Sequence, residues 1–127
     1  MQADLTPDRP ELETGEQLAF QRPGISRNEM RQLRRGNYSI QAEIDLHGLT
    51  VSEAQIELRS FVTECVDRNL RCIRVVHGKG LRSGDNGPVL KANVNYWLPG
   101  WDEVLAFCSA LPRHGGTGAI YVLLKTL

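Results

Sequence analysis

Residues 40–58 read IQAEIDLHGLTVSEAQIEL, and this stretch predicts how the chain folds. Apolar and polar residues alternate up to Leu46, which is the period of a β-strand with one buried face. Gly48 ends that pattern, and Thr50, followed three residues later by Glu53, forms a capping box that opens a helix. A strand that leads directly into a helix is the first half of a βαβ unit, so the sequence indicates an α/β protein.

The rest of the chain continues this alternation of strands and helices. The first helix should run to about Asn69, because apolar residues recur at helical spacing along one face. A second strand follows at 72–76, a second helix begins at Pro88, and two more strands lie at 104–107 and 119–124. The sequence therefore predicts a two-layer α/β sandwich with a mixed four-stranded sheet, in the order βαβαββ.

Residues 1–39 are predicted to form a flexible N-terminal extension with a basic arm, and residues 40–127 to form the folded domain. The first 24 residues hold few apolar side chains and three prolines, which is typical of a tail. Ser26 followed by Glu29 predicts a short helix that ends before Gly36. Such a short helix would be marginal without tertiary contacts.

Composition excludes several classes of protein. The 127 residues include 41% hydrophobic and 24% charged side chains, which are values of one ordinary globular domain. No apolar run approaches the ~18 residues of a membrane span, and the acidic N-terminus is unlike a secretory signal. Three cysteines at unrelated spacings predict reduced thiols and a cytoplasmic protein.

Charge is balanced over the whole chain but unevenly distributed. Fifteen Lys and Arg match fifteen Asp and Glu. Basic residues nevertheless concentrate in residues 21–40 and 68–91, where they can contact a polyanion. The candidate nucleic-acid contacts in these stretches include Arg34, Arg35 and Lys91.

Two histidines and an aspartate stand where predicted strands end. Asp45 and His47 are two residues apart, so their side chains point to the same side of the sheet. His77 occupies the equivalent position after the second strand. Because ligands of open α/β sheets collect at the carboxyl ends of strands, we expect these side chains to share one edge. The alternative is structural, since strand-end aspartates often bind turn amides and His77 can serve the backbone.

A glycine-rich segment, HGKG at 77–80, follows the second strand. Its amides can form an anion-binding nest, and Lys79 and Arg82 add positive charge suited to a phosphodiester backbone. A solvated loop without a ligand is the alternative. Ser83 replaces the third glycine of a dinucleotide fingerprint, and Gly80 replaces the Ser or Thr of a P-loop. No nucleotide cofactor is therefore expected.

A second glycine-rich loop, HGGTG at 114–118, precedes the last strand. Its glycines favour a tight turn. Arg113 and His114 remain possible substrate contacts.

Four segments, in this order along the chain, resemble the Smr (small MutS-related) domain: IDLHGLTVSEA, RVVHGKGLRS, PVLKANVNYWL and VLAFCSALPRHGGTGAIYVLLK. The resemblance covers residues 40–126, and LRRGNYSIQAEIDLHG resembles the lead-in of stand-alone bacterial Smr proteins. It implies an endonuclease-type domain that acts on DNA or RNA, with the ribosome as a possible partner. Asp45 and His47 match the motif associated with cleavage. The motif associated with phosphate binding is matched by His77, Gly78, Lys79 and Gly80.

These observations favour acid–base cleavage of a phosphodiester bond. His47 would exchange a proton near neutral pH, Asp45 would orient it or accept a proton from a substrate hydroxyl, and His77 is the third catalytic candidate. One aspartate is a thin ligand set for Mg²⁺, so we expect metal-independent chemistry, for which RNA supplies its own 2′-hydroxyl. The alternative is a binding module for nucleic acid or the ribosome that does not cleave.

Overall fold

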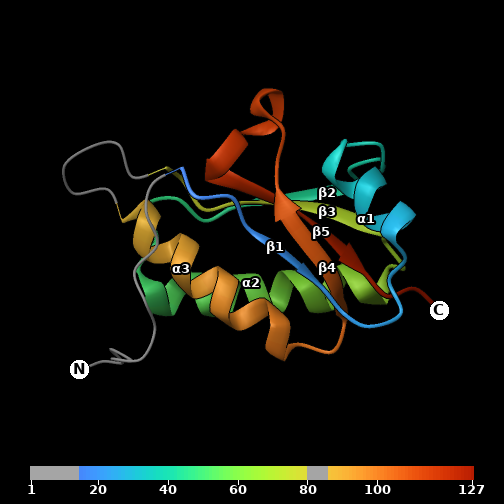
Figure 1. Cartoon of the computed structure of the whole chain (residues 1–127). Coiled ribbons are helices and arrows are strands. Elements are labelled where there is room, and N and C mark those ends of the chain that lie inside the picture. Colours follow the sequence, from blue (N-terminus) through green and yellow to red (C-terminus); the bar gives the residue numbers. More distant parts are fainter. Residues whose placement is uncertain (1–14, 80–85) are drawn as a thin grey trace.

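The computed structural model describes residues 15–79 and 86–127. Within them, a mixed sheet of five strands has the order β1-β4-β5-β3-β2 (Figure 1). The strands are β1 (Ala19–Gln21), β2 (Ala42–Asp45), β3 (Cys72–Val76), β4 (Val104–Ser109) and β5 (Ala119–Leu124). The helices are α1 (Arg27–Arg34), α2 (Val51–Asp67) and α3 (Gly87–Trp97), with short 3-10 turns at Leu98–Gly100, Pro112–His114 and Gly116–Gly118.

Helices cover both faces of this sheet. The long helices α2 and α3 lie against one face, where Leu58, Val94 and Phe107 belong to the main core. The short helix α1 lies on the other face, where Met30 and Leu33 pack into a second cluster around Tyr121. The two-layer prediction therefore misses the helix on the second face. None of the described helices is long and apolar enough to cross a bilayer.

The prediction of four strands was wrong, because β1 adds a fifth strand antiparallel to β4. Residues 19–21 lie inside the segment assigned to a flexible extension. Long-range contacts hold this strand in place: the Leu18 amide donates to Ser109 Oγ at 2.8 Å. The Arg22 guanidinium donates to three main-chain carbonyls, those of Pro99, Trp101 and Val104. A strand that depends on such distant partners leaves little local signal in the sequence.

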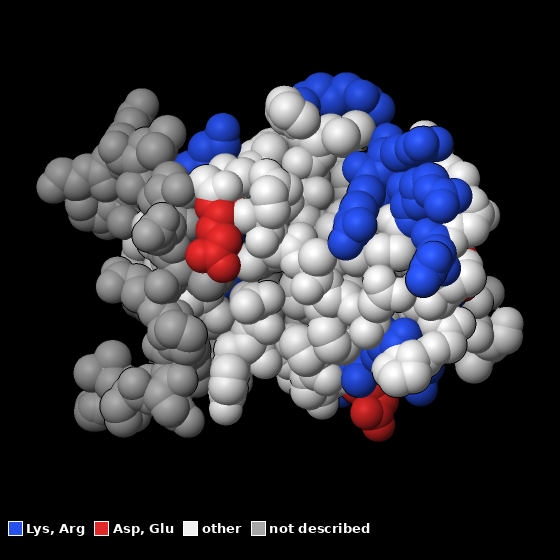
Figure 2. Space-filling model, in the orientation of Figure 1, with Lys and Arg blue, Asp and Glu red and all other residues white. Residues whose placement is uncertain are grey.

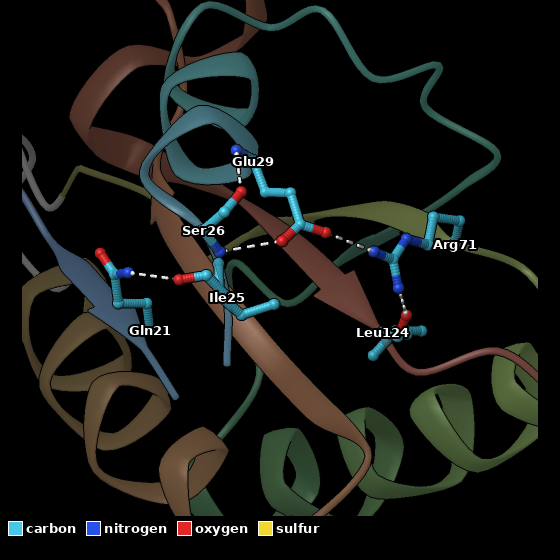
Figure 3. Close-up of polar contacts among 6 residues, drawn as sticks. All are labelled: Gln21, Ile25, Ser26, Glu29, Arg71 and Leu124. Carbon is cyan, nitrogen blue, oxygen red and sulfur yellow. Dashed lines mark hydrogen bonds and ion pairs between the residues drawn. The ribbon is translucent and has the colours of Figure 1, made fainter. Parts of the chain in front are cut away.

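The predicted capping boxes are present at both helix starts. Thr50 and Glu53 cap α2, and Ser26 and Glu29 cap α1 (Figure 3). The second carboxylate oxygen of Glu29 also lies 3.4 Å from the Arg71 guanidinium, which in turn donates to the Leu124 carbonyl. These bonds fasten the cap of α1 to the sheet, so that the helix is not the isolated and marginal element the sequence suggested.

The strand directions place several loops at one edge of the sheet. β2 and β3 are parallel, with Asp45 opposite Val76. β5 runs antiparallel to both β3 and β4, and β1 runs antiparallel to β4. β2, β3 and β4 therefore end, and β5 and β1 begin, at the same edge, which we call the loop edge.

The three cysteines are free and buried, in agreement with the predicted reduced thiols. Burial raises the pKa of Cys72 to about 12 and that of Cys108 to about 11. Neither side chain is therefore a reactive thiolate at neutral pH.

Two basic side chains are buried next to the loop edge. His77 is 0% exposed, and its Nδ1 lies 2.9 Å from the Gly78 carbonyl oxygen. Among the described residues, its Nε2 has no hydrogen-bond partner. Lys91 on α3 is 2% exposed and donates to the main-chain carbonyl of Glu16. Burial lowers the pKa of both groups, that of His77 to about 4.

The burial of His77 predicts a loss of stability in mild acid. The fold holds the neutral ring, so stability is complete above the ordinary pKa of 6.5 and falls as pH drops toward 4. At about 1.4 kcal/mol per pKa unit, the cost is roughly 1.4 kcal/mol by pH 5.5 and up to about 3 kcal/mol near pH 4. Urea unfolding at several pH values, for wild type and His77→Gln, measures this contribution.

The glutamine variant should show the weaker pH dependence of the two. His114→Gln, which replaces a half-buried imidazole, is the matched control and should follow the wild-type profile. Parallel profiles for wild type and His77→Gln would contradict the assignment.

Candidate active site

Asp45 and His47 form a hydrogen-bonded pair at the loop edge. One carboxylate oxygen of Asp45, Oδ1, lies 3.0 Å from the main-chain nitrogen of His47 and 2.8 Å from its ring Nδ1. Because an ionised carboxylate can only accept hydrogen bonds, Nδ1 carries a proton. Proton exchange with a substrate would therefore use Nε2, the other ring nitrogen. Both side chains reach the surface, with 49% and 66% of their areas exposed.

Local sequence explains why this pair forms. Leu46 is fully buried in the main core, and its amide donates to the Val76 carbonyl at 2.7 Å. Anchoring Leu46 turns its two neighbours to the opposite side, and Gly48, at a φ of +85°, makes the turn that follows. Asp45 also binds a turn amide, so the structural alternative considered for this residue holds together with the functional one.

The two glycine-rich loops pack against each other beside this pair. The amides of His77 and Gly78 both donate to the Gly118 carbonyl at 3.0 Å. A Cβ on Gly118 would lie only 2.8 Å from Lys79 Cγ. The HGGTG loop therefore makes the predicted tight turn and also supports Lys79, whose side chain is exposed.

The contacts of this loop correct two predicted roles. The Gly78 amide is already bound to Gly118, so the predicted nest does not include it as a donor for phosphate. Full burial of His77 argues against direct contact with a substrate, and its hydrogen bond to Gly78 is the backbone role weighed as the alternative. Gly80 and Arg82 lie outside the described residues.

The remaining predicted contacts divide between surface and interior. Lys91 is buried and bound to the Glu16 carbonyl, which contradicts a role in binding nucleic acid from the surface. Arg34 and Arg35 are exposed at the end of α1. Figure 2 shows Lys and Arg side chains gathered over α1.

His114 is held by its neighbours rather than projecting alone. Its Nδ1 lies 2.5 Å from the hydroxyl of Tyr121, and its carbonyl accepts from Arg74 at 2.6 Å. Arg74 also donates to Glu43, which is on the same face of β2 as Asp45. The Arg74–Glu43 ion pair thus neutralises the acid nearest in sequence to the candidate pair. Arg113 is exposed beside His114.

Two of the predicted contacts line a common hollow that the sequence does not predict. Lys79 and Arg34 line the same hollow, of about 570 Å³, although they are 45 residues apart in sequence. Residues 108–112 form part of its wall. Arg34 comes close to Lys79 because α1 packs on the second face of the sheet, and no local sequence pattern predicts that packing. Within residues 15–79 and 86–127, no group of three or more His, Cys, Asp or Glu is placed to hold a metal ion.

Comparison with curated proteins gives named relatives of similar sequence. The chain is 36% identical to the "Probable DNA endonuclease SmrA" of Escherichia coli over 108 residues, which are 85% of this chain and 58% of that protein. It is 38% identical to the "Ribosome rescue factor SmrB" of Yersinia enterocolitica over 117 residues, 92% of this chain and 63% of that protein. The chain thus spans about three fifths of the length of these relatives.

Two solved structures share the fold. YdaL, a stand-alone small MutS-related protein from Escherichia coli, superposes with a TM-score of 0.83 at 33% identity, covering 95% of this chain and 92% of YdaL. The Smr domain of Thermus thermophilus MutS2 gives a TM-score of 0.59 at 33% identity, covering 66% of this chain and 98% of that domain. The family model of the Smr domain matches residues 44–125. Because the sequence, the fold and the family model agree, the chain belongs to the Smr domain family.

Proposed function

We propose that this protein is an endonuclease that cleaves RNA by acid–base chemistry at the loop edge. The observation that carries the proposal is the 2.8 Å contact between Asp45 Oδ1 and His47 Nδ1 on an exposed rim. Lys79, at the end of the neighbouring parallel strand, supplies the positive charge for a phosphate. A relative named a probable DNA endonuclease supports a nuclease, and relatives named ribosome rescue factors support action near the ribosome.

The reaction we propose breaks one P–O bond without a covalent enzyme intermediate. Nε2 of His47 removes the proton of the 2′-hydroxyl, and the 2′-oxygen attacks the adjacent phosphorus. The bond to the 5′-oxygen breaks, and that oxygen takes a proton from solvent. The products are a 2′,3′-cyclic phosphate and a 5′-hydroxyl. Asp45 stabilises the imidazolium, and Lys79 offsets the charge that grows on the phosphate oxygens.

RNA is the substrate we favour over DNA, because DNA lacks the 2′-hydroxyl and would need an activated water. This route uses the residues the site offers: one imidazole, one carboxylate and one lysine. We place the protein in the cytoplasm, with RNA near the ribosome as its target and without a nucleotide cofactor.

A non-catalytic binding module is the second candidate. Full burial of His77 favours it, because burial removes one of the two imidazoles that the sequence had offered for proton transfer. The relatives named ribosome rescue factors are compatible with a protein that only binds there.

Replacing His47 separates the two candidates. General acid–base catalysis contributes ~10²–10⁴-fold, so His47→Ala should lose that much of the cleavage rate and keep its affinity for RNA. Single-turnover cleavage of an end-labelled RNA, with the termini identified as cyclic phosphate or not, measures the effect. The reaction should persist in EDTA.

The matched pair for this experiment is Asp45→Asn and Asp102→Asn. Both aspartates are exposed, but Asp102 precedes β4 at the edge opposite the loop edge. The first variant should be slowed, and the second should cut at the wild-type rate. Cleavage by His47→Ala at the wild-type rate would refute the mechanism, and RNA binding without strand breaks in the wild type would favour the binding module.

Replacing Lys79 tests the phosphate contact. Each lost cation–phosphate contact lowers the salt dependence of single-strand binding by about 0.7 in the log–log slope. Lys79→Gln should show this change in fluorescence anisotropy titrations at several salt concentrations between about 50 and 200 mM, the range over which counterion release changes the affinity. Lys125→Gln, an exposed lysine that follows β5 at the opposite edge, is the control and should leave the slope unchanged. Equal slopes for the two variants would contradict the role of Lys79.

A further inference from the structure

Three arginines of α1 form one row. Arg27, Arg31 and Arg34 are spaced four and three residues apart, so they lie on the same side of the helix. All three are exposed. The row extends for roughly 10 Å along the helix axis.

This row lies along a groove that leads to the loop edge. A smaller hollow, of about 270 Å³, is lined by Gln21 of β1 and by Arg27, Met30, Arg31 and Arg34 of α1. The larger hollow, of about 570 Å³, is lined by Arg34 and Lys79 and by residues 17–19 at the start of β1. Arg34 lines both hollows and both border β1, so the two hollows are neighbours, and we call them together the α1–β1 groove.

The charge of the α1–β1 groove has a single sign. Among the described residues that line its two hollows, every charged side chain is an arginine or a lysine. The acidic residue of α1, Glu29, is turned instead toward Arg71 and the cap of its own helix (Figure 3). Arg22, nearby in sequence, contributes nothing to the groove, because its guanidinium donates to main-chain carbonyls. The groove therefore presents uncompensated cations.

The larger hollow also offers an apolar wall. Leu111 and Pro112 line it beside the two cations and reach the surface, whereas Leu18 and Ala110, which also line it, are each only 5% exposed. An unpaired nucleotide can place its base against such a wall while its phosphate contacts Arg34 or Lys79. A paired base cannot, because its faces are stacked and its edges are bonded inside the duplex.

We propose that the α1–β1 groove binds one unpaired strand of RNA and leads it past Lys79 to the Asp45–His47 pair. This inference rests on the proposed function and names the form of its substrate: a strand that is single over at least the nucleotides in the groove. The groove sets affinity, whereas the Asp45–His47 pair carries out the chemistry. Arg27, Arg31 and Arg34 are binding residues without a part in bond cleavage.

Binding measured without cleavage tests the groove separately from the mechanism. The probe is a fluorescein-labelled oligouridylate of about ten nucleotides, long enough to exceed the arginine row. Titration uses the full chain carrying Asp45→Asn. Adding Arg31→Gln and Arg34→Gln should weaken binding about tenfold and lower the salt slope by about 1.4, the value for two lost phosphate contacts. Restoring the charge with Arg31→Lys and Arg34→Lys should recover most of the affinity.

The control is Arg68→Gln, compared with each single α1 substitution, which likewise removes one positive charge; Arg68 is an exposed arginine at the end of α2, on the other face of the sheet. It should bind the probe as the Asp45→Asn parent does, and circular dichroism should show all variants folded. The same strand annealed to its complement should bind more weakly than the free strand. Equal losses for the α1 and Arg68 variants, or a duplex that binds as tightly as the single strand, would overturn the groove. If the protein with intact Asp45 binds the strand through the groove but leaves it uncut, the proposed cleavage is refuted and the groove stands.

Discussion

The parallel pairing of β2 with β3 is the constraint on which the site depends. The bond from the Leu46 amide to the Val76 carbonyl sets the register and makes DLH and HGK end at the same level. β5 then reinforces that arrangement from the other side. All six of its residues are buried, and it runs antiparallel to both neighbours, so the HGGTG loop that precedes it must emerge at the same edge. Shifting β2 by one residue would turn Asp45 and His47 into the core and Leu46 into solvent.

The parts of the fold that sequence could predict are those with a strong local period. The strands around Ile44, Val75 and Val122 and the helix between Thr50 and Asp67 appear near their expected positions, because alternation and capping are written within a few residues. β1 was not predicted, because a strand of three residues is too short to show an alternating pattern of apolar and polar residues. β1 is held in position instead by the hydrogen bonds of Arg22 and by the bond from the Leu18 amide to Ser109. Leu18 and Ser109 are 91 residues apart in sequence.

The candidate site was predictable to a similar extent. The sequence identified Asp45 and His47 correctly as neighbours, since residues two positions apart along a strand point to the same side. It could not distinguish exposed basic residues from buried ones. Lys91 and His77 stand in a basic stretch, but Lys91 lies on the buried face of α3 and His77 lies under the glycine loops. Of the other basic residues in this stretch, Arg71 and Arg74 form ion pairs with Glu29 and Glu43. A count of charges in a stretch therefore overstates what that stretch offers to a polyanion.

The family match covers residues 44–125, whereas α1 and β1 lie before it. The Asp45–His47 pair and Lys79 belong to the domain that the family model matches. One wall of the α1–β1 groove, however, comes from the preceding segment, which contains the three-residue strand β1 and the capped helix α1. The proposed catalytic pair and most of the arginines of the proposed binding groove thus come from separate stretches of one chain. Evolution can exchange the leading stretch without disturbing the strand register that brings Asp45 and His47 together.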